Sequence, residues 1–105
     1  MATYFGVSGN KISGALHVAL LPHNLKYLNL RDNNFSGTVD WDALPSSIEY
    51  VYLSNNQFKG NVNLDVLPSS LEYLNLTNNK FTSVTAKKRD ALMVIGIPGI
   101  KSYFI

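Results

Sequence analysis

Apolar and polar positions along the chain recur at one fixed interval, which we call the repeat. Leu-Pro pairs stand at positions 21–22, 44–45 and 67–68, and each precedes the same run of residue types. That run reads Leu-x-x-Leu-x-Leu-x-x-Asn-x-Phe. Three blocks carry it in full: Leu25, Leu28, Leu30, Asn33, Phe35; Ile48, Val51, Leu53, Asn56, Phe58; and Leu71, Leu74, Leu76, Asn79, Phe81. A first block has weaker residues at the same places: Ala2, Phe5, Val7, Asn10 and Ile12. Agreement at this many positions predicts a repeat architecture.

The Leu-x-Leu centre of each block predicts a short strand, because apolar and polar residues alternate there. In the second block Leu28 and Leu30 point inward, whereas Tyr27, Asn29 and Arg31 point outward. Equivalent strands then stack in parallel, about 4.8 Å apart, and form one sheet on a concave side. No single block can bury its own apolar face, so the stack is the folding unit.

Asparagine and phenylalanine keep fixed places after each predicted strand. The asparagines fall where the chain turns away from the strand, and a buried amide there can bond backbone groups of its own block and the next. The phenylalanines are expected to form an aromatic spine inside the convex side. The prolines are expected in the connection that leads into the next strand, because proline cannot donate to a ladder. The return segment is too short for a long helix and predicts extended or 3₁₀ pieces.

This pattern resembles that of leucine-rich repeat proteins, and the resemblance covers residues 2–82. The Asn-Phe-Ser-Gly stretch at 34–37 is similar to plant-type arrays, and the Leu-Pro-Ser-Ser-Leu phrasing to protozoan ones. The resemblance implies an α/β-type repeat solenoid. It would be a short right-handed horseshoe with a parallel concave sheet and a mostly non-helical convex side.

The length of 105 residues favours a single domain, residues 1–105. We expect repeats at about 2–24, 25–47, 48–70 and 71–91, followed by an irregular C-terminal strand and cap at 92–105. Leu92, Ile95 and Ile97 carry the Leu-x-x-Leu-x-Leu spacing again and predict a fifth strand, although Leu92 follows Leu71 at less than a full repeat. Residues 85–91 predict a convex turn or short helix, and the apolar residues of 100–105 are expected to cover the last repeat.

The N-terminal end has no comparable cap, because the first strand is expected at residue 2 or 3. An unpaired edge over an open core is a liability in a sheet protein. This favours a chain that is a fragment of a longer protein, or an end that something else covers. For the isolated chain we expect either fraying of the first block or self-association of two chains through their N-terminal edges.

Composition and charge exclude several classes of protein. Hydrophobic residues make up 46% and charged residues 15%, which is too apolar for a disordered chain. A net charge of +2 is too weak for a dedicated nucleic-acid binder, and the short basic run at 87–89 is more typical of a solvated capping turn. No apolar run approaches the roughly 18 residues of a membrane span. The chain has no cysteine, which excludes disulfides, thiolate metal sites and a cysteine nucleophile.

Signals of cellular location point in two directions. The N-terminus lacks the basic region and the long apolar region that are typical of a signal peptide. The absence of cysteine favours a reducing, cytoplasmic compartment. Glycosylation sequons at Asn34 and Asn75 favour an extracellular one.

Motifs of catalysis and cofactor binding are absent from the sequence. There is no Gly-x-Ser-x-Gly, no phosphate loop and no Gly-x-Gly-x-x-Gly. His17 and His23 lack partners at metal-ligand spacing. We therefore expect no enzyme activity, no metal and no cofactor.

The exposed strand positions are the best candidates for function, because tyrosine occupies one of them in all four blocks. Tyrosine offers a rigid amphipathic surface and is enriched at binding hot spots. We expect a ligand-binding face formed by Tyr4, Tyr27, Asn29, Arg31, Asp32, Tyr50, Tyr52, Ser54, Tyr73, Asn75 and Thr77. The expected role is non-catalytic binding of a protein or peptide. The alternatives are glycan binding, a structural spacer or cap of a larger protein, and tyrosines that duplication kept because their stacking stabilises the sheet.

Overall fold

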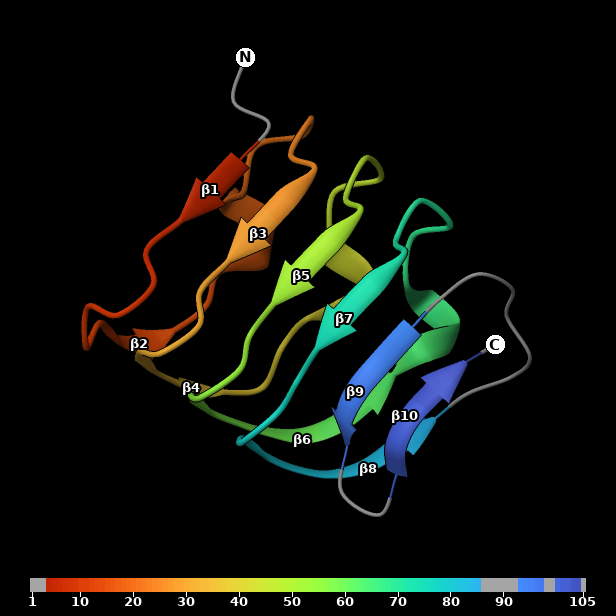
Figure 1. The fold of residues 1–105 in the computed structure, drawn as a ribbon. Helices are drawn as coiled ribbons and strands as arrows, with labels where there is room; N and C mark the ends of the chain where they lie inside the picture. Colours follow the sequence, from red (N-terminus) through yellow and green to blue (C-terminus); the bar gives the residue numbers. More distant parts are fainter. Residues whose placement is uncertain (1–3, 86–92, 98–99, 105) are drawn as a thin grey trace.

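A computed structural model of the chain describes residues 4–85, 93–97 and 100–104. The chain forms two sheets (Figure 1). The first has the order β1 (Tyr4–Gly6), β3 (Tyr27–Asn29), β5 (Tyr50–Tyr52), β7 (Tyr73–Asn75), β9 (Met93–Ile97) and β10 (Ile100–Phe104). The second has the order β2 (Ser13–Ala15), β4 (Asn34–Gly37), β6 (Gln57–Asn63) and β8 (Lys80–Thr85). All neighbours are parallel except β9 and β10.

Each repeat contributes one strand to each sheet, and a 3₁₀ turn closes the first three repeats. These turns are η1 (Val18–Leu20), η2 (Trp41–Ala43) and η3 (Leu64–Val66). The described residues contain no α-helix, so the helical layer of an α/β-type fold is not found in them. The structure instead has two parallel sheets of four repeat strands each, with β9 and β10 added to the first. None of the helices in the described part of the chain has the length and hydropathy to cross a bilayer.

The two sheets keep different registers. In the first sheet Tyr27 pairs with Tyr50, its equivalent in the next block, so the offset is one full repeat. In the second sheet Gly37 pairs with Phe58, an offset that is shorter than a repeat by two positions, and the same holds for Gly14 and Phe35. Each phenylalanine therefore lies beside the glycine of the preceding repeat. These glycines have positive φ angles, such as 83° at Gly37, a conformation that L side chains rarely adopt.

The expected phenylalanine spine is confirmed. The rings of Phe35 and Phe58 lie 6.1 Å apart with 5° between their planes, and those of Phe58 and Phe81 lie 6.4 Å apart at 13°. All three are buried, and Trp41 packs against Phe81 at 5.9 Å. The inward leucines of the middle strands are also buried, and they form one core together with the phenylalanine spine.

The expected asparagine ladder is present, but its direction is opposite to the expected one, because each amide bonds its own turn and the preceding repeat rather than the next. Asn56 shows the geometry. Its side-chain Oδ1 accepts the Phe35 N–H at 3.0 Å. Its Nδ2 donates to the carbonyls of Leu30 at 2.9 Å, Leu53 at 3.2 Å and Ser54 at 3.2 Å. One buried amide thus holds its own turn and binds the preceding repeat.

The other asparagines occupy the same role to different extents. Asn33 accepts the Ile12 N–H at 3.0 Å, and Asn79 accepts the Phe58 N–H at 3.1 Å. The Asn10 side chain donates only to its own turn, to the carbonyls of Val7 and Ser8, and it is exposed. The first repeat therefore has the weakest asparagine contact among these four.

A second polar ladder, formed by serine, follows the prolines. Ser47 donates its hydroxyl to the carbonyl of Leu25 at 2.8 Å, and Ser70 donates to that of Ile48 at 2.7 Å. The prolines lie in the expected connections, where the Pro45 carbonyl accepts the Ile48 N–H at 3.1 Å. The serine contacts also link each repeat to the one before it.

The expected fifth strand is present as β9, but its register differs from the expected one. Leu74 pairs with Val94, whereas the spacing of the sequence predicts Ile95 as its partner. A slip of one position exchanges the two faces of a strand. The segment Met93–Ile97 is apolar at nearly every position, so neither face of the pattern selects the register. Of the turn or helix expected over 85–91, Thr85 instead ends strand β8, and residues 86–91 lie outside the described residues. Ala2, Thr3, Leu92, Pro98, Gly99 and Ile105 also lie outside them.

Candidate binding face

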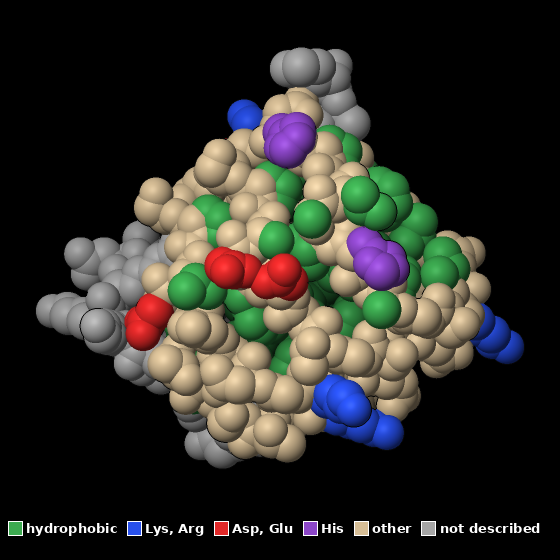
Figure 2. All heavy atoms as spheres, turned by 180° about the vertical axis from the view of Figure 1, so that it is seen from behind, with side chains coloured by type: hydrophobic (Ala, Val, Ile, Leu, Met, Phe, Trp, Pro, Cys, Tyr) green, Lys and Arg blue, Asp and Glu red, His purple; other side chains and the backbone are tan. Residues whose placement is uncertain are grey.

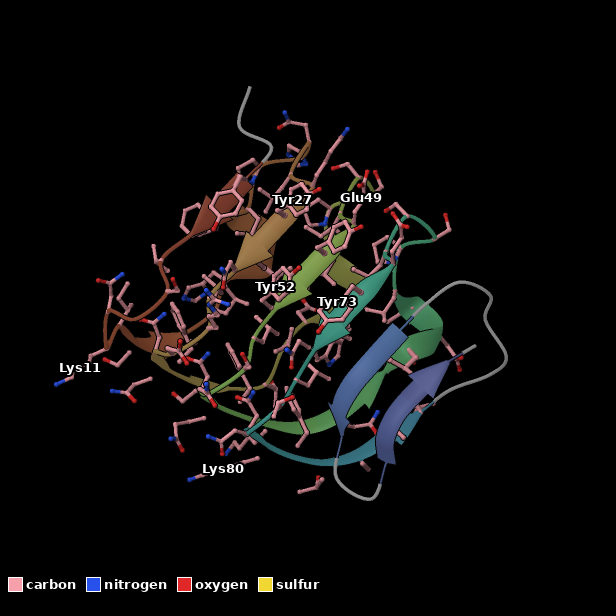
Figure 3. The ribbon with its side chains drawn as sticks, in the orientation of Figure 1. Lys11, Tyr27, Glu49, Tyr52, Tyr73 and Lys80 are labelled. Carbon is pink, nitrogen blue, oxygen red and sulfur yellow. The ribbon has the colours of Figure 1, made fainter. Side chains whose placement is uncertain are left out.

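The outward side of β1, β3, β5 and β7 carries two adjacent rows of side chains, which we call the tyrosine face (Figure 3). One row is Tyr4, Tyr27, Tyr50 and Tyr73, and the other is Gly6, Asn29, Tyr52 and Asn75. The parallel register places equivalent residues directly side by side. Five of the six tyrosines of the chain lie in these two rows.

The tyrosine rings form a continuous row of contacts rather than isolated side chains. Tyr27 and Tyr50 stack with centroids 4.9 Å apart and 15° between planes. Tyr4 contacts Tyr27 at 6.4 Å, and Tyr50 contacts Tyr73 at 6.4 Å, with tilts of 43° and 40°. Tyr52 joins from the second row, 5.3 Å from Tyr73. Tyr27 and Tyr50 therefore cover one face of each other, whereas the other pairs meet at a tilt.

Exposure along the row falls from the N-terminal end. Tyr4 is 59% exposed and Tyr27 38%, whereas Tyr50, Tyr52 and Tyr73 are half-buried. Gly6 leaves room for the first ring, because a Cβ there would lie 2.6 Å from the Tyr4 hydroxyl. A ligand on this face would therefore meet rings already held by their neighbours, at a low cost in side-chain entropy.

The amide groups of the face are partly occupied within the chain. The Asn75 Oδ1 accepts the Thr77 N–H at 3.1 Å and the Thr77 hydroxyl at 2.7 Å. The Asn29 Oδ1 accepts the Arg31 N–H at 3.3 Å. These bonds orient both amides across the strand ends and fix where their NH₂ groups can meet a ligand.

Four of the expected site residues lie beyond the strands rather than on them. Ser54 and Thr77 follow β5 and β7, and their carbonyls accept amide protons of the asparagine ladder. Arg31 is exposed and holds the same place after β3. Asp32 lies one residue further on, in the turn. The structure thus joins the tyrosines and the two amides closely and places these four at one margin.

Asp32 belongs to a row of turn residues with positive φ angles. The angle is 60° at Asp32, 59° at Asn55 and 57° at Asn78, and Gly9 completes the row at 73°. Aspartate and asparagine tolerate this left-handed conformation better than most residues. Asn55 donates to the Asp32 carboxylate, and Asn78 donates to the Asn55 amide oxygen at 2.9 Å. The turn conformation and these bonds give Asp32 a structural role.

The electrostatics of the face centre on Tyr50. The Glu72 carboxylate, just before the neighbouring strand, raises the pKa of the Tyr50 hydroxyl, and desolvation adds to the effect. The site residues expected from the sequence did not include Glu72, which is exposed, or Glu49, which is half-buried, although each directly precedes a tyrosine of the face.

The opposite side of the molecule carries the 3₁₀ turns, and it is chemically mixed (Figure 2). Leu20 is 82% exposed and Val66, at the equivalent position, 41%. A hydrogen bond with Asp42 raises the pKa of Asp40, and their mutual repulsion acts in the same direction. No group of three or more potential metal ligands lies together in the described part of the chain.

Comparison with known proteins gives a family and no close relative. The family model of the FNIP repeat matches residues 14–56 and again residues 41–79. No curated protein and no solved structure matches the chain. The two overlapping matches together span residues 14–79, which include two of the complete blocks and the third as far as Asn79.

Proposed function

The chain belongs to the FNIP repeat family, and we propose from this that it is a non-catalytic interaction module that binds a protein or peptide across the tyrosine face. The observation that carries the proposal is the row of four tyrosines in register on one exposed face. Repeat proteins of this kind present extended surfaces to their ligands. The resemblance to leucine-rich repeats supports a solenoid architecture of that type as a finer proposal.

The chemistry of the face suits an extended polypeptide. Tyrosine supplies apolar area with a hydroxyl at its end, and Asn29 and Asn75 add amides whose orientation is set by bonds within the chain. A peptide backbone presents alternating donors and acceptors, which hydroxyls and amides can both satisfy. The rings are ordered before binding, so less entropy is lost when a partner arrives.

Ring geometry favours a peptide over a glycan. Sugars bind aromatic residues through the open face of a ring. Tyr27 and Tyr50 turn their faces toward each other at 4.9 Å, which leaves edges and hydroxyls for a ligand. The Tyr73 ring contacts the rings of both Tyr50 and Tyr52. Glycan binding is therefore the second candidate.

A library of displayed peptides, selected on the intact chain, tests the proposal. Affinities of the selected peptides are then measured for the chain and for its Tyr50→Ala and Tyr52→Ala variants. We expect each variant to weaken binding by about 1–2 kcal/mol or more, because both side chains lie at the middle of the face. Lys59→Ala, an exposed change on β6, is the matched control and should leave affinity unchanged.

Two results would count against the peptide proposal. Selected peptides that bind equally well to the tyrosine variants would show that the face is not the binding site. Saturable binding on a glycan array that is lost in Tyr52→Ala, with no peptide selected, would favour the glycan alternative. Failure to bind any ligand of either class would favour a spacer.

A further inference from the structure

Three charged residues border the tyrosine face where its strands begin. Lys26, Glu49 and Glu72 occupy the same place in successive repeats, directly before the tyrosines of β3, β5 and β7. Backbone bonds hold them side by side, because the Glu49 N–H donates to the Lys26 carbonyl at 2.9 Å and the Glu72 N–H donates to the Glu49 carbonyl at 2.8 Å. They therefore form a row that runs along the tyrosine row, and we call it the charged row.

The charged row is basic beside β3 and acidic beside β5 and β7. Lys26 and Glu72 are exposed, and Glu49 is half-buried at the start of β5 (Figure 3). Within the described part of the chain, no hydrogen bond or ion pair holds any of these three side chains. The Glu72 carboxylate is the main cause of the raised pKa of Tyr50, and Glu49 adds to it, so the acidic charges act on the rings. A ligand on the rings would be exposed to the same charges.

The opposite margin of the face has the same polarity. Arg31 follows β3 and is exposed, whereas the equivalent positions after β5 and β7 hold the uncharged residues Ser54 and Thr77. Asp32 offsets part of the Arg31 charge, but its carboxylate accepts a hydrogen bond from Asn55 in the turn. Positive charge therefore gathers around β3, and negative charge around β5 and β7.

We infer, on the basis of the proposed function, that the peptide bound by the tyrosine face carries an acidic residue over Lys26 and a basic residue between Glu49 and Glu72. In this orientation opposite charges meet at both places, and in the reverse orientation like charges meet. The charge pattern thus sets the direction in which the peptide crosses the strands.

The strand spacing gives the separation of the two charged residues in the peptide. Neighbouring strands lie about 4.8 Å apart, so Lys26 and Glu72, two strands apart, are separated by roughly 10 Å. A peptide in the polyproline II conformation rises about 3.1 Å per residue and has three residues per turn. Its residues i and i+3 then point to the same side about 9 Å apart, which matches the charged row.

Peptides selected on the unmodified chain test this charge pattern. A displayed library with glutamate and arginine equally frequent at every position should yield peptides with one acidic and one basic residue about three positions apart, in one order only. Exchanging these two residues within a selected peptide should weaken binding at least about fivefold at low ionic strength, because two attractive pairs become repulsive. The difference should shrink near 1 M salt, where the Debye length falls to about 3 Å. Equal affinity of the two peptides would overturn the inference.

Exchanging the charges of the chain itself gives the complementary test. The double variant Lys26→Glu, Glu72→Lys keeps the net charge and changes two exposed side chains. It should prefer the peptide with the exchanged order. The control Lys59→Glu, an exposed change on β6 in the second sheet, should keep the original preference. The same preference in the double variant and the unmodified chain would contradict the assigned orientation.

The Tyr50→Ala variant separates failure of this inference from failure of the proposed function. Peptides that lose affinity in Tyr50→Ala but bind equally well in both charge orders would show that the tyrosine face binds peptides and that the charge pattern is wrong. Peptides that bind Tyr50→Ala as tightly as the unmodified chain, or a library that yields none, would overturn both.

Discussion

Replacing Asn56 by alanine should destabilise the fold far more than the same change at Asn10. Asn56 is 4% exposed and makes four hydrogen bonds to the backbone. Asn10 occupies the equivalent position in the first repeat and is exposed, and its side chain donates only within its own turn. The two substitutions remove the same atoms, so the difference between them measures the ladder contact itself.

The magnitude follows from which groups lose their only partner. The carbonyls of Leu30 and Leu53 also accept the amides of Asn33 and Asn79, at 3.1 and 2.8 Å, so both keep a donor. The Phe35 N–H has no such substitute and becomes a buried, unpaired donor, which costs about 1–3 kcal/mol. With the net value of the three lost carbonyl bonds, we expect a loss of about 3 kcal/mol for Asn56→Ala. For Asn10→Ala we expect less than about 1 kcal/mol.

Denaturant unfolding of both variants and the unmodified chain measures these values, provided that the m-values agree. A loss of about 3 kcal/mol corresponds to a fall in melting temperature of roughly 10–20 °C for a domain of this size. Amide exchange adds a local readout, because the Phe35 N–H should exchange faster in Asn56→Ala. Equal unfolding free energies for the two variants would refute the assignment of a structural role to the buried amide.

Three further predictions concern the spine, the turn and the tyrosine face. Phe58→Ala should cost about 3–5 kcal/mol in denaturant unfolding, because the ring is fully buried, whereas Ile12→Ala should cost much less. Gly37→Ala should cost about 1 kcal/mol through its φ of 83° alone, since no atom lies within 4 Å of an added Cβ; no change in unfolding free energy would contradict this. In ultraviolet titration Tyr50 should ionise above the usual phenol pKa, and Glu72→Gln should lower that pKa. Because the pKa is higher in the folded than in the unfolded chain, the free energy of unfolding should fall as the pH rises from the unfolded pKa to beyond the folded one.

The first sheet could be predicted from the sequence, because apolar and polar residues alternate along each of its strands and the apolar ones must be buried. Leu28, Val51 and Leu74 must be buried, and a period of two then places Tyr27, Tyr50 and their neighbours on the other face. The members of the tyrosine face follow from the same rule. Their ring angles do not, since these depend on how each side chain packs against the next strand.

The second sheet could not be predicted in the same way. Strand β4 is only Asn34–Gly37, which is too short for alternation to show, and it ends on a glycine in a left-handed conformation. Its register, in which Gly37 pairs with Phe58 rather than with Gly60, is also invisible in a sequence that has a single repeat interval. The serine ladder could have been predicted, because Ser47 and Ser70 are one repeat apart. Asn24 occupies the equivalent position in the preceding block, so the sequence shows serine there in only two blocks.

The asparagine ladder has a direction, and this matters for how the chain is made. Each amide oxygen reaches back into the preceding repeat, from Asn33 to Ile12, from Asn56 to Phe35 and from Asn79 to Phe58. A ribosome synthesises the chain from the N-terminus, so each turn obtains its last backbone partner only when the next asparagine has left the exit tunnel. Folding during synthesis would then advance one turn behind translation, and replacing an asparagine would harm the turn already made as well as its own.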